Sequence, residues 1–295
     1  MKKTLTILLG TLLSQSAHTS PKLTDNVDKK LNESYLSQYL YGYDFSSVKQ
    51  LNDWQIEGVG LASVVNGQLI LEPEFHQPMI RLYQQGKFSN KNSAKEYGQY
   101  LVAEVATKYP DINSNLYVNG IFRGGHFNIW NKHSTPENYA ISFDFKSLSS
   151  QALHMIMFSS QGFNGEDVLT GGLKPRIGLA QEIMHGDLHQ YRISYFFPWR
   201  KTANMRKAPG RNMSAQGRDF SSEMPEKTHT MVITKYQGKI NYFVNGQHAL
   251  YYSDDSPFSG GNWGFRLMVL AKGAYDNIKV YQLNQDPVNS TTDKK

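Results

Sequence analysis

The residue types that could do chemistry gather in one basic stretch of the chain, residues 174–218. This stretch holds nine Lys or Arg and only two acids. Aromatic side chains lie among these charges, at Tyr191, Tyr195, Phe196, Phe197 and Trp199. A surface that is cationic, polar and aromatic suits an anionic sugar polymer or a nucleic acid. The alternative is a solvated loop with one strand inside it, and the flanking segments have to decide between the two.

Eliminative cleavage of a uronic-acid polymer is the chemistry that these residue types fit best. A cation or hydrogen-bond donor neutralises the carboxylate, a base removes the C5 proton, and an acid protonates the leaving oxygen. His185 is the candidate base, because imidazole titrates near neutrality, and Tyr195 is the candidate for the second proton transfer. We expect Arg206 and Arg266 to bind the carboxylate as bidentate forks.

Each of these four catalytic candidates has a structural alternative, which for the two arginines is a solvated surface. His185 precedes a Gly-Asp pair and could brace a turn. Tyr195 could face the core, because strand parity alone does not say which face of a sheet is buried. Arg266 alternates with Phe265 and Leu267, so we expect its side chain to point away from the core.

Binding residues are expected on both sides of the basic stretch. Residues 121–130 mix Arg123, His126 and Trp130 after a predicted strand, and they could form sugar subsites with Trp130 stacked on a ring. The alternative is a packed loop with a core Trp. Within the stretch, we expect Arg211 to line the same groove as Arg206 and Arg266, beside Trp199. Residues 204–210 are expected to form a loop that folds back over the sheet, since loops on a rigid scaffold often carry binding residues.

Other chemistries find less support in the sequence. No Glu-x-Asp-x-x-Glu string occurs, so a pair of hydrolytic carboxylates from one strand is missing. There is no His-Glu-x-x-His, no Gly-x-Ser-x-Gly and no phosphate loop. We therefore expect no required cofactor. A structural calcium ion remains open, with Asp276 as an oxygen ligand, and the alternative is a hydrogen bond at a turn or strand end.

Composition and the first residues place the protein outside the cytoplasm. Residues 1–20 have a basic start, an apolar run and small polar residues, which predicts a secretory signal peptide. The chain has no cysteine, which excludes disulfides, thiolate metal sites and a lipidated cysteine anchor. The net charge of +6 favours anionic partners. In a periplasmic or secreted protein without a membrane span, that partner is expected to be an acidic polysaccharide, not a nucleic acid.

The elements that must position these residues are mostly strands. Residues 141–145 alternate with period two, and Asn66-Gly67, Gln237-Gly238 and Asn245-Gly246 predict hairpin turns. Strands at this spacing without crossover helices imply one antiparallel jelly-roll domain over residues 21–283. An insert at about 74–115 breaks the pattern with a helix at 92–109, and a disordered polar tail is expected at 284–295.

Two terminal segments of the domain resemble the concanavalin-A-like jelly rolls. The segments are WQIEGVGLASVVNGQLILEP and GFRLMVLAKGAYDNIKVYQL, residues 54–73 and 264–283. A second set of motifs resembles the YesU-like family of polysaccharide-utilisation neighbourhoods. It comprises Gly165-Glu166-Asp167, Arg176, Gly178, Glu182, Gly186-Asp187, Ser194-Tyr195-Phe196, Asn204-Met205-Arg206-Lys207 and Gly210.

The YesU-like resemblance implies a jelly roll that handles plant or algal polysaccharide. It covers roughly residues 45–71 and 139–283. From its motifs we add Arg176, Glu182 and Asn204 to the substrate-binding candidates. We therefore expect a carbohydrate-active protein that acts on a uronic-acid-containing saccharide by β-elimination, as a lyase or dehydratase. A non-catalytic sugar-binding protein is the alternative, and a glycoside hydrolase ranks below both.

Overall fold

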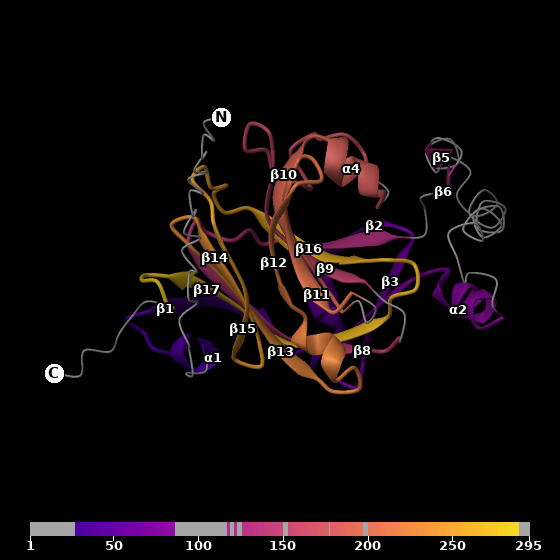
Figure 1. Ribbon diagram of the computed structural model, residues 1–295, viewed down its shortest axis with the longest axis horizontal. Helices are drawn as coiled ribbons and strands as arrows, with labels where there is room; N and C mark the ends of the chain where they lie inside the picture. The colour runs from indigo at the N-terminus through magenta and orange to yellow at the C-terminus, as the bar shows by residue number, and fades with distance from the viewer. Residues whose placement is uncertain are drawn as a thin grey trace, which may run out of the picture.

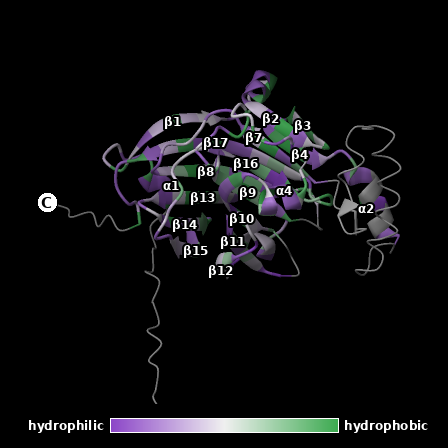
Figure 2. Cartoon of the chain, turned by 90° about the horizontal axis from the view of Figure 1, so that it is seen from above, coloured by the Kyte–Doolittle hydropathy of each residue, from purple (hydrophilic) through white to green (hydrophobic). Residues whose placement is uncertain are grey.

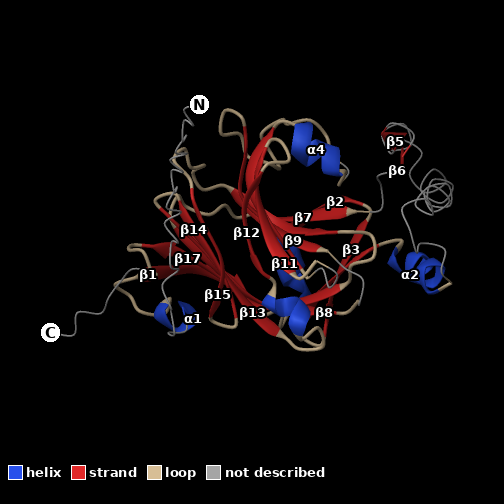
Figure 3. Cartoon of the chain, in the orientation of Figure 1, coloured by secondary structure: helices blue, strands red, loops and turns tan. Residues whose placement is uncertain are grey.

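The protein is an all-β sandwich of two antiparallel sheets (Figures 1 and 3). The computed structural model describes residues 27–85, 117–118, 121–122, 126–149, 153–176, 178–196 and 200–288. Within these residues the helices are short: α1 (Val27–Lys30), α2 (His76–Gln84), α4 (Ala180–His185) and the 3-10 turns Val48–Asp53 and Phe220–Glu223. The all-β jelly-roll prediction is therefore confirmed.

The first sheet, sheet A, has eight strands in the order β15-β14-β13-β8-β17-β4-β3, with β1 also paired to β17. Its strands are β1 (Ser37–Tyr43), β3 (Gly60–Val65), β4 (Gln68–Pro73), β8 (Tyr139–Ser147), β13 (His229–Tyr236), β14 (Lys239–Val244), β15 (Gln247–Ser253) and β17 (Gly273–Leu283). The three predicted hairpin turns join neighbouring strands of this sheet. At the turn between β3 and β4, Asn66 and Gly67 have φ values of 51° and 74°, as a type I′ turn requires.

The second sheet, sheet B, has seven strands in the order β12-β11-β10-β9-β16-β7-β2. Its strands are β2 (Trp54–Gly58), β7 (Phe127–Asn131), β9 (His154–Gly162), β10 (Leu188–Tyr195), β11 (Thr202–Ala208), β12 (Met213–Arg218) and β16 (Asn262–Leu267). A separate two-stranded pair joins β5 (Tyr117–Val118) and β6 (Ile121–Phe122). In the views of Figures 1 and 2, α2 lies beside the sandwich, outside both sheets.

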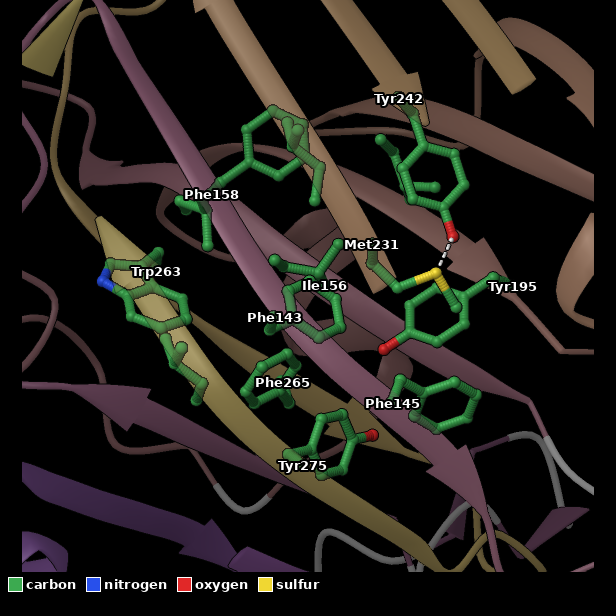
Figure 4. Close-up of a cluster of buried hydrophobic side chains, with 14 of the residues drawn as sticks. Phe143, Phe145, Ile156, Phe158, Tyr195, Met231, Tyr242, Trp263, Phe265 and Tyr275 are labelled. Atoms are coloured by element: carbon green, nitrogen blue, oxygen red, sulfur yellow. Dashed lines mark hydrogen bonds between the residues drawn. The ribbon is translucent and has the colours of Figure 1, made fainter. Parts of the chain in front are cut away.

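The core lies between the two sheets and is rich in aromatic rings (Figure 4). Phe265 of sheet B and Tyr275 of sheet A have ring centroids 4.3 Å apart, and the Tyr242 hydroxyl lies 3.2 Å from the Met231 sulfur. Apolar side chains reach this core at every second position of each strand. The intervening side chains of sheet B therefore point to its outer face, away from sheet A.

Residues 204–207 form part of strand β11, which corrects the expected loop over the sheet. Ala203 and Met205 are fully buried in the core, so the sequence around them has the alternation of a half-buried strand. At the C-terminal end, the chain stays packed beyond the expected boundary at residue 283. The Asn284 amide donates to the Leu36 carbonyl at 2.8 Å, and Val288 contacts a buried apolar cluster. The predicted signal peptide, the predicted helix at 92–109 and the last seven residues lie outside the described residues.

Candidate functional site

The outer face of sheet B carries a row of five side chains across neighbouring strands, and four of them are polar. Arg266 on β16 pairs in register with Asn128 on β7 and with Met155 on β9. Met155 in turn pairs with Ser194 on β10, which pairs with Asn204 on β11. Because paired residues in a sheet share one face, these five side chains lie side by side on the outer face.

Four arginines surround a cavity of about 210 Å³ on this face. We call it the arginine pocket and define it by its lining residues. They are Leu153, Met155, Ile183, Met184, Arg192, Ser194, Arg200, Asn204, Arg206, Arg266 and Met268. The described lining thus holds four guanidinium groups, an amide and a hydroxyl, but no carboxylate, imidazole or phenol.

Arg266 is the most buried arginine of the arginine pocket, with 2% of its surface exposed. Its Nη1 donates to the Asn128 side-chain oxygen at 2.8 Å and to the Gly178 carbonyl at 2.7 Å. Its Nη2 has no hydrogen-bond partner among the described residues. Burial, and after it the charge of Arg192, lowers the pKa of Arg266 to about 10, against the opposing effect of Glu182 and Glu57. One buried donor therefore remains for a ligand.

Arg192 and Arg206 stand directly opposite each other on β10 and β11. Burial, followed by the Arg206 charge, lowers the pKa of Arg192 to about 10. Arg206 donates to the Arg211 carbonyl at 2.6 Å, and Arg192 makes a longer bond of 3.3 Å to the Gly210 carbonyl. Like charges directly opposite in a sheet are unfavourable, so an anion placed between them would be stabilised.

Arg200 adds a fourth cation from the segment between β10 and β11. Its Nη2 donates to the Ser194 hydroxyl at 3.0 Å and its Nε to the Thr202 carbonyl at 3.0 Å. Burial lowers its pKa, Asp219 opposes that shift, and Arg206 adds to it. The four guanidinium groups thus line one cavity. After burial, the Arg206 charge lowers the pKa of Arg192, and the Arg192 charge lowers the pKa of Arg266.

Helix α4 forms one apolar side of the arginine pocket with Ile183 and Met184. Helix α4 packs on the outer face of sheet B through an apolar cluster that is separate from the main core. This cluster comprises Trp130, Met157, Val168, Ile183, Leu188 and Ala208, with Leu169 and Leu173 packed against it. Glu182 in the first turn of α4 accepts a hydrogen bond from the Leu179 amide at 2.7 Å and so stabilises the start of the helix.

Three sequence-predicted residues line the arginine pocket: Arg206, Arg266 and Asn204. The predicted outward direction of Arg266 is confirmed by its place opposite Asn128 and Met155. Arg211 lies at the rim, where its exposed side chain contacts the Met184 sulfur at 3.1 Å. The catalytic and binding roles of these residues remain predictions.

Tyr195 lies in the core and not at the arginine pocket, which corrects its expected place. It is fully buried beside Phe145, with ring centroids 5.1 Å apart (Figure 4). The inward face of β10 carries Tyr191, Ile193 and Tyr195, and Arg192 and Ser194 point outward. Since a buried phenol between two sheets cannot reach a substrate on the outer face, the proton-transfer role expected of Tyr195 does not fit this placement.

Trp130 is also corrected, because it is fully buried in the cluster under α4 and offers no ring to a sugar. Arg176 is buried in a bidentate ion pair with Glu57, with its Nη2 2.6 Å from Glu57 Oε1. Arg176 also donates to the Val168 carbonyl at 2.7 Å and to the Lys174 carbonyl at 3.3 Å. Arg176 therefore fastens a loop to β2 and does not point into the arginine pocket.

The two histidine candidates also lie apart from the arginine pocket lining. His185 is exposed at the last residue of α4. His126 is half-buried, and its Nδ1 accepts a hydrogen bond from the Val269 amide at 3.0 Å. Glu182, as described above, serves the start of α4. Arg123 and Trp199 lie outside the described residues.

Asp276, the candidate calcium ligand, makes a local hydrogen bond to the next residue. Its Oδ1 accepts a hydrogen bond from the Asn277 amide at 2.7 Å, at an irregular position in β17. Burial raises the pKa of Asp276, helped by the nearby charges of Asp144 and Asp44. Across the described part of the chain, no three His, Asp or Glu side chains come close enough together to hold a metal ion.

Sequence reasoning missed several residues of the arginine pocket. Arg192 and Ser194 alternate with Tyr191, Ile193 and Tyr195, and a charged residue at every second position of an apolar strand marks the outer face. That signal was present and also places Tyr195 inward. Arg200, Met155, Met184 and Met268 come from four separate segments, and no local pattern unites them.

A family model described as a domain of unknown function (DUF1961) matches residues 81–280, which is more than half of the chain. The chain belongs to the DUF1961 family. This match includes every described residue of the arginine pocket. No curated protein matches the sequence of this DUF1961 member.

One solved structure shares the fold of this DUF1961 protein, and others match it more weakly. A Bacillus subtilis protein of unknown function with a galectin-like fold is 22% identical and superposes with a TM-score of 0.64, over 85% of this chain and 100% of that chain. The Emp46p carbohydrate recognition domain gives 0.47 at 9% identity, over 83% and 98%. A lichenase from a mouse hindgut metagenome gives 0.45 at 10% identity, over 82% and 97%. The first match shows the galectin-like sandwich, and the other two say nothing about the ligand of this chain.

The described helices are all too short or too polar to cross a membrane.

Proposed function

We propose that this DUF1961 protein binds an acidic saccharide in the arginine pocket. The observation that carries the proposal is the set of four arginines around one cavity, with no carboxylate in the described lining. Two of them, Arg192 and Arg266, are almost fully buried, and their pKa values are lowered to about 10. A nearby anion favours the charged form of a buried cation, so these two arginines would gain from a bound anion.

A uronate residue matches the chemistry of the arginine pocket. Guanidinium groups bind a carboxylate through paired hydrogen bonds, and the open Nη2 of Arg266 supplies a donor for it. Ser194 and Asn204 can exchange hydrogen bonds with sugar hydroxyls. The methionine and leucine side chains offer an apolar surface to the C–H face of a pyranose ring. The resemblance to the YesU-like family, with its polysaccharide-utilisation context, supports a saccharide as the ligand.

Eliminative cleavage is the second candidate, and the buried arginines favour it because they would neutralise a uronate carboxylate. That neutralisation is the first requirement of β-elimination. The described lining offers no imidazole, phenol or carboxylate to remove the C5 proton. We therefore place binding first. The formation of a 4,5-unsaturated uronate, followed by its ultraviolet absorbance during incubation with acidic polysaccharides, tests the lyase and dehydratase hypotheses together.

The proposed place of action is the periplasm or the exterior of the cell. Its support is the predicted signal peptide at residues 1–20, together with the absence of cysteine. Determining the N-terminal sequence of the protein recovered from its own host tests this proposal. A protein that retains residues 1–20 would contradict it.

Titration of arginine variants with an oligo-uronate tests the binding site. Arg206→Ala and Arg266→Ala should each weaken binding by about 10- to 150-fold, because a hydrogen bond to a desolvated charge contributes ~1.5–3 kcal/mol. Arg211→Ala should have a smaller effect, since its side chain is exposed at the rim. Isothermal titration calorimetry with oligomers of galacturonate, glucuronate and mannuronate gives the affinities.

Lys239→Ala serves as the matched control, because it removes one positive charge from the exposed surface of sheet A. Its affinity should equal that of the parent. Thermal melting checks that each variant is folded, and Arg206→Ala carries the test if Arg266→Ala is not. If both pocket variants bind every oligo-uronate as the parent does, the arginine pocket is not the binding site.

A further inference from the structure

Among the described residues, the arginine pocket ends at helix α4 on one side. On β9, Met155 lines the pocket, but Met157, the next outward side chain, is fully buried. On β7, the outward Trp130 is fully buried in the same apolar cluster, together with Ile183 of α4. Helix α4 and the apolar cluster beneath it therefore close the outer face at this end of the pocket.

A second side of the arginine pocket is closed at Gly178. The Gly178 carbonyl accepts a hydrogen bond from Arg266, so the backbone crosses the sheet beside that guanidinium. Gly178 has a φ of 83°, and a Cβ at this position would lie 2.6 Å from the His126 carbonyl oxygen. Gly178 is therefore packed directly against the start of β7.

The size and lining of the arginine pocket fit one sugar ring. Its volume of about 210 Å³ lies below the ~300–1,000 Å³ of cavities that hold drug-sized ligands. The arginines supply the polar part of the lining, and Met155, Met184 and Met268 supply the apolar part. A single uronate can place its carboxylate on the arginines and its C–H face on the methionines. Helix α4 and the backbone at Gly178 border this ring-sized pocket on two sides.

We propose that the arginine pocket binds one terminal uronate residue of a saccharide chain and excludes internal residues. This inference rests on the proposed function and adds to it the position in the chain that is recognised. The carboxylate of the end residue reaches Arg266 and Arg192, and the rest of the chain leaves through the open side of the pocket.

Binding assays with polyuronates of different length test this inference. Preparations of polygalacturonate, alginate and polyglucuronate are each fractionated into short and long chains and compared at equal mass. If ends are bound, apparent affinity per unit mass should rise from the long to the short fraction, by the ratio of their chain-end concentrations. The same titrations should superimpose when they are plotted against the molar concentration of chains. Binding that depends on mass alone, whatever the chain length, would overturn the inference and leave the proposed function intact.

Two further results separate failure of the inference from failure of the proposed function. If no uronate of any length binds, the proposed function is wrong and the inference falls with it. Arg206→Ala is measured with the short fraction, and Lys239→Ala is its control. Binding at the arginine pocket predicts that only Arg206→Ala loses affinity. If chain-end binding is unchanged in Arg206→Ala, the ends are bound elsewhere and the inference is wrong.

Discussion

Two buried arginines of this protein differ in their hydrogen-bond partners. Nη2 of Arg266 has no partner among the described residues. In Arg176, by contrast, both Nε and Nη2 donate to the Glu57 carboxylate. Both side chains are nearly inaccessible to water. An arginine with a carboxylate partner holds the fold together. A buried arginine that has no carboxylate partner and keeps an unpaired donor fits a ligand site better.

Breaking the Arg176–Glu57 pair should be costly. Glu57→Ala leaves a buried guanidinium without its carboxylate, and we expect a loss of about 3–5 kcal/mol in the free energy of unfolding. Arg218→Ala is the comparison, because the Arg218–Glu223 pair is exposed and should contribute about 0–1 kcal/mol. Denaturant unfolding followed by fluorescence measures both. Equal losses in the two variants would mean that the burial of Arg176 is not what makes its pair important.

His154 should make the fold sensitive to acid. It is fully buried, its Nδ1 lies 2.9 Å from the Tyr275 hydroxyl, and burial, then the charge of His76, lowers its pKa to about 3. The unfolded chain therefore binds more protons than the folded one between about pH 6.5 and pH 3. Stability from this residue is complete above that range and falls as the pH falls, by roughly 2 kcal/mol between pH 7 and pH 5.

The His154→Gln variant checks this pH dependence. Between pH 7 and pH 5, the parent should lose about 2 kcal/mol more unfolding free energy than the variant loses. The measurement is denaturant unfolding at constant ionic strength at each pH. Parallel stability curves for the two proteins would show that His154 is not the group that titrates.

At the level of elements, strand β16 links the core to the candidate site. The consecutive residues Phe265 and Arg266 point to opposite faces of sheet B. The preceding residue, Gly264, is paired with β7. A Cβ at Gly264 would lie 2.0 Å from the Ile129 carbonyl oxygen. The two strands approach so closely that only glycine fits there.

Gly264→Ala should therefore force β16 and β7 apart. We expect a loss of at least ~2–3 kcal/mol in unfolding free energy and weaker oligo-uronate binding, since Arg266 moves with the strand. Ser63→Ala, an exposed position on β3, should change stability by less than ~0.5 kcal/mol. Chemical denaturation and calorimetric titration give the two quantities. A Gly264→Ala variant as stable as Ser63→Ala would contradict the close approach of the strands.

At the scale of the whole molecule, the net charge of +6 adds a long-range attraction for acidic saccharides. Its reach depends on salt, because the screening length falls from ~30 Å at 0.01 M to ~8 Å at 0.15 M ionic strength. The buried arginines are screened less than surface charges. The attraction should therefore be partly lost in salt, and the contribution of the pocket should persist.

The affinity for an oligo-uronate should fall as sodium chloride is raised over this range, chiefly through slower association. Binding kinetics measured with the protein immobilised on a sensor surface, at several salt concentrations, provide the association and dissociation rates. The ratio of affinities between the parent and Arg206→Ala should change less than either affinity alone. Affinities that do not depend on salt would argue against an ionic ligand.

The sequence alone determined the class of fold and part of the candidate site. Period-two alternation and Asn-Gly turns are local properties, and they predicted the antiparallel strands and the hairpins correctly. The same alternation placed Arg266 on the outer face. The alternation on β10 also indicates that Arg192 points outward and Tyr195 inward, because apolar residues of one parity must face the core of a sandwich. The sequence-based prediction did not use this signal.

Only the tertiary structure decided which polar residues meet. Arg192, Arg200, Arg206 and Arg266 come from three strands and a connecting segment, and strand order in sheet B brings them around one cavity. It also decided that Arg176 pairs with Glu57 and that Trp130 lies beneath α4. Pairing between strands distant in sequence depends on the packing of the whole core, and no pattern within a single segment of the chain specifies it.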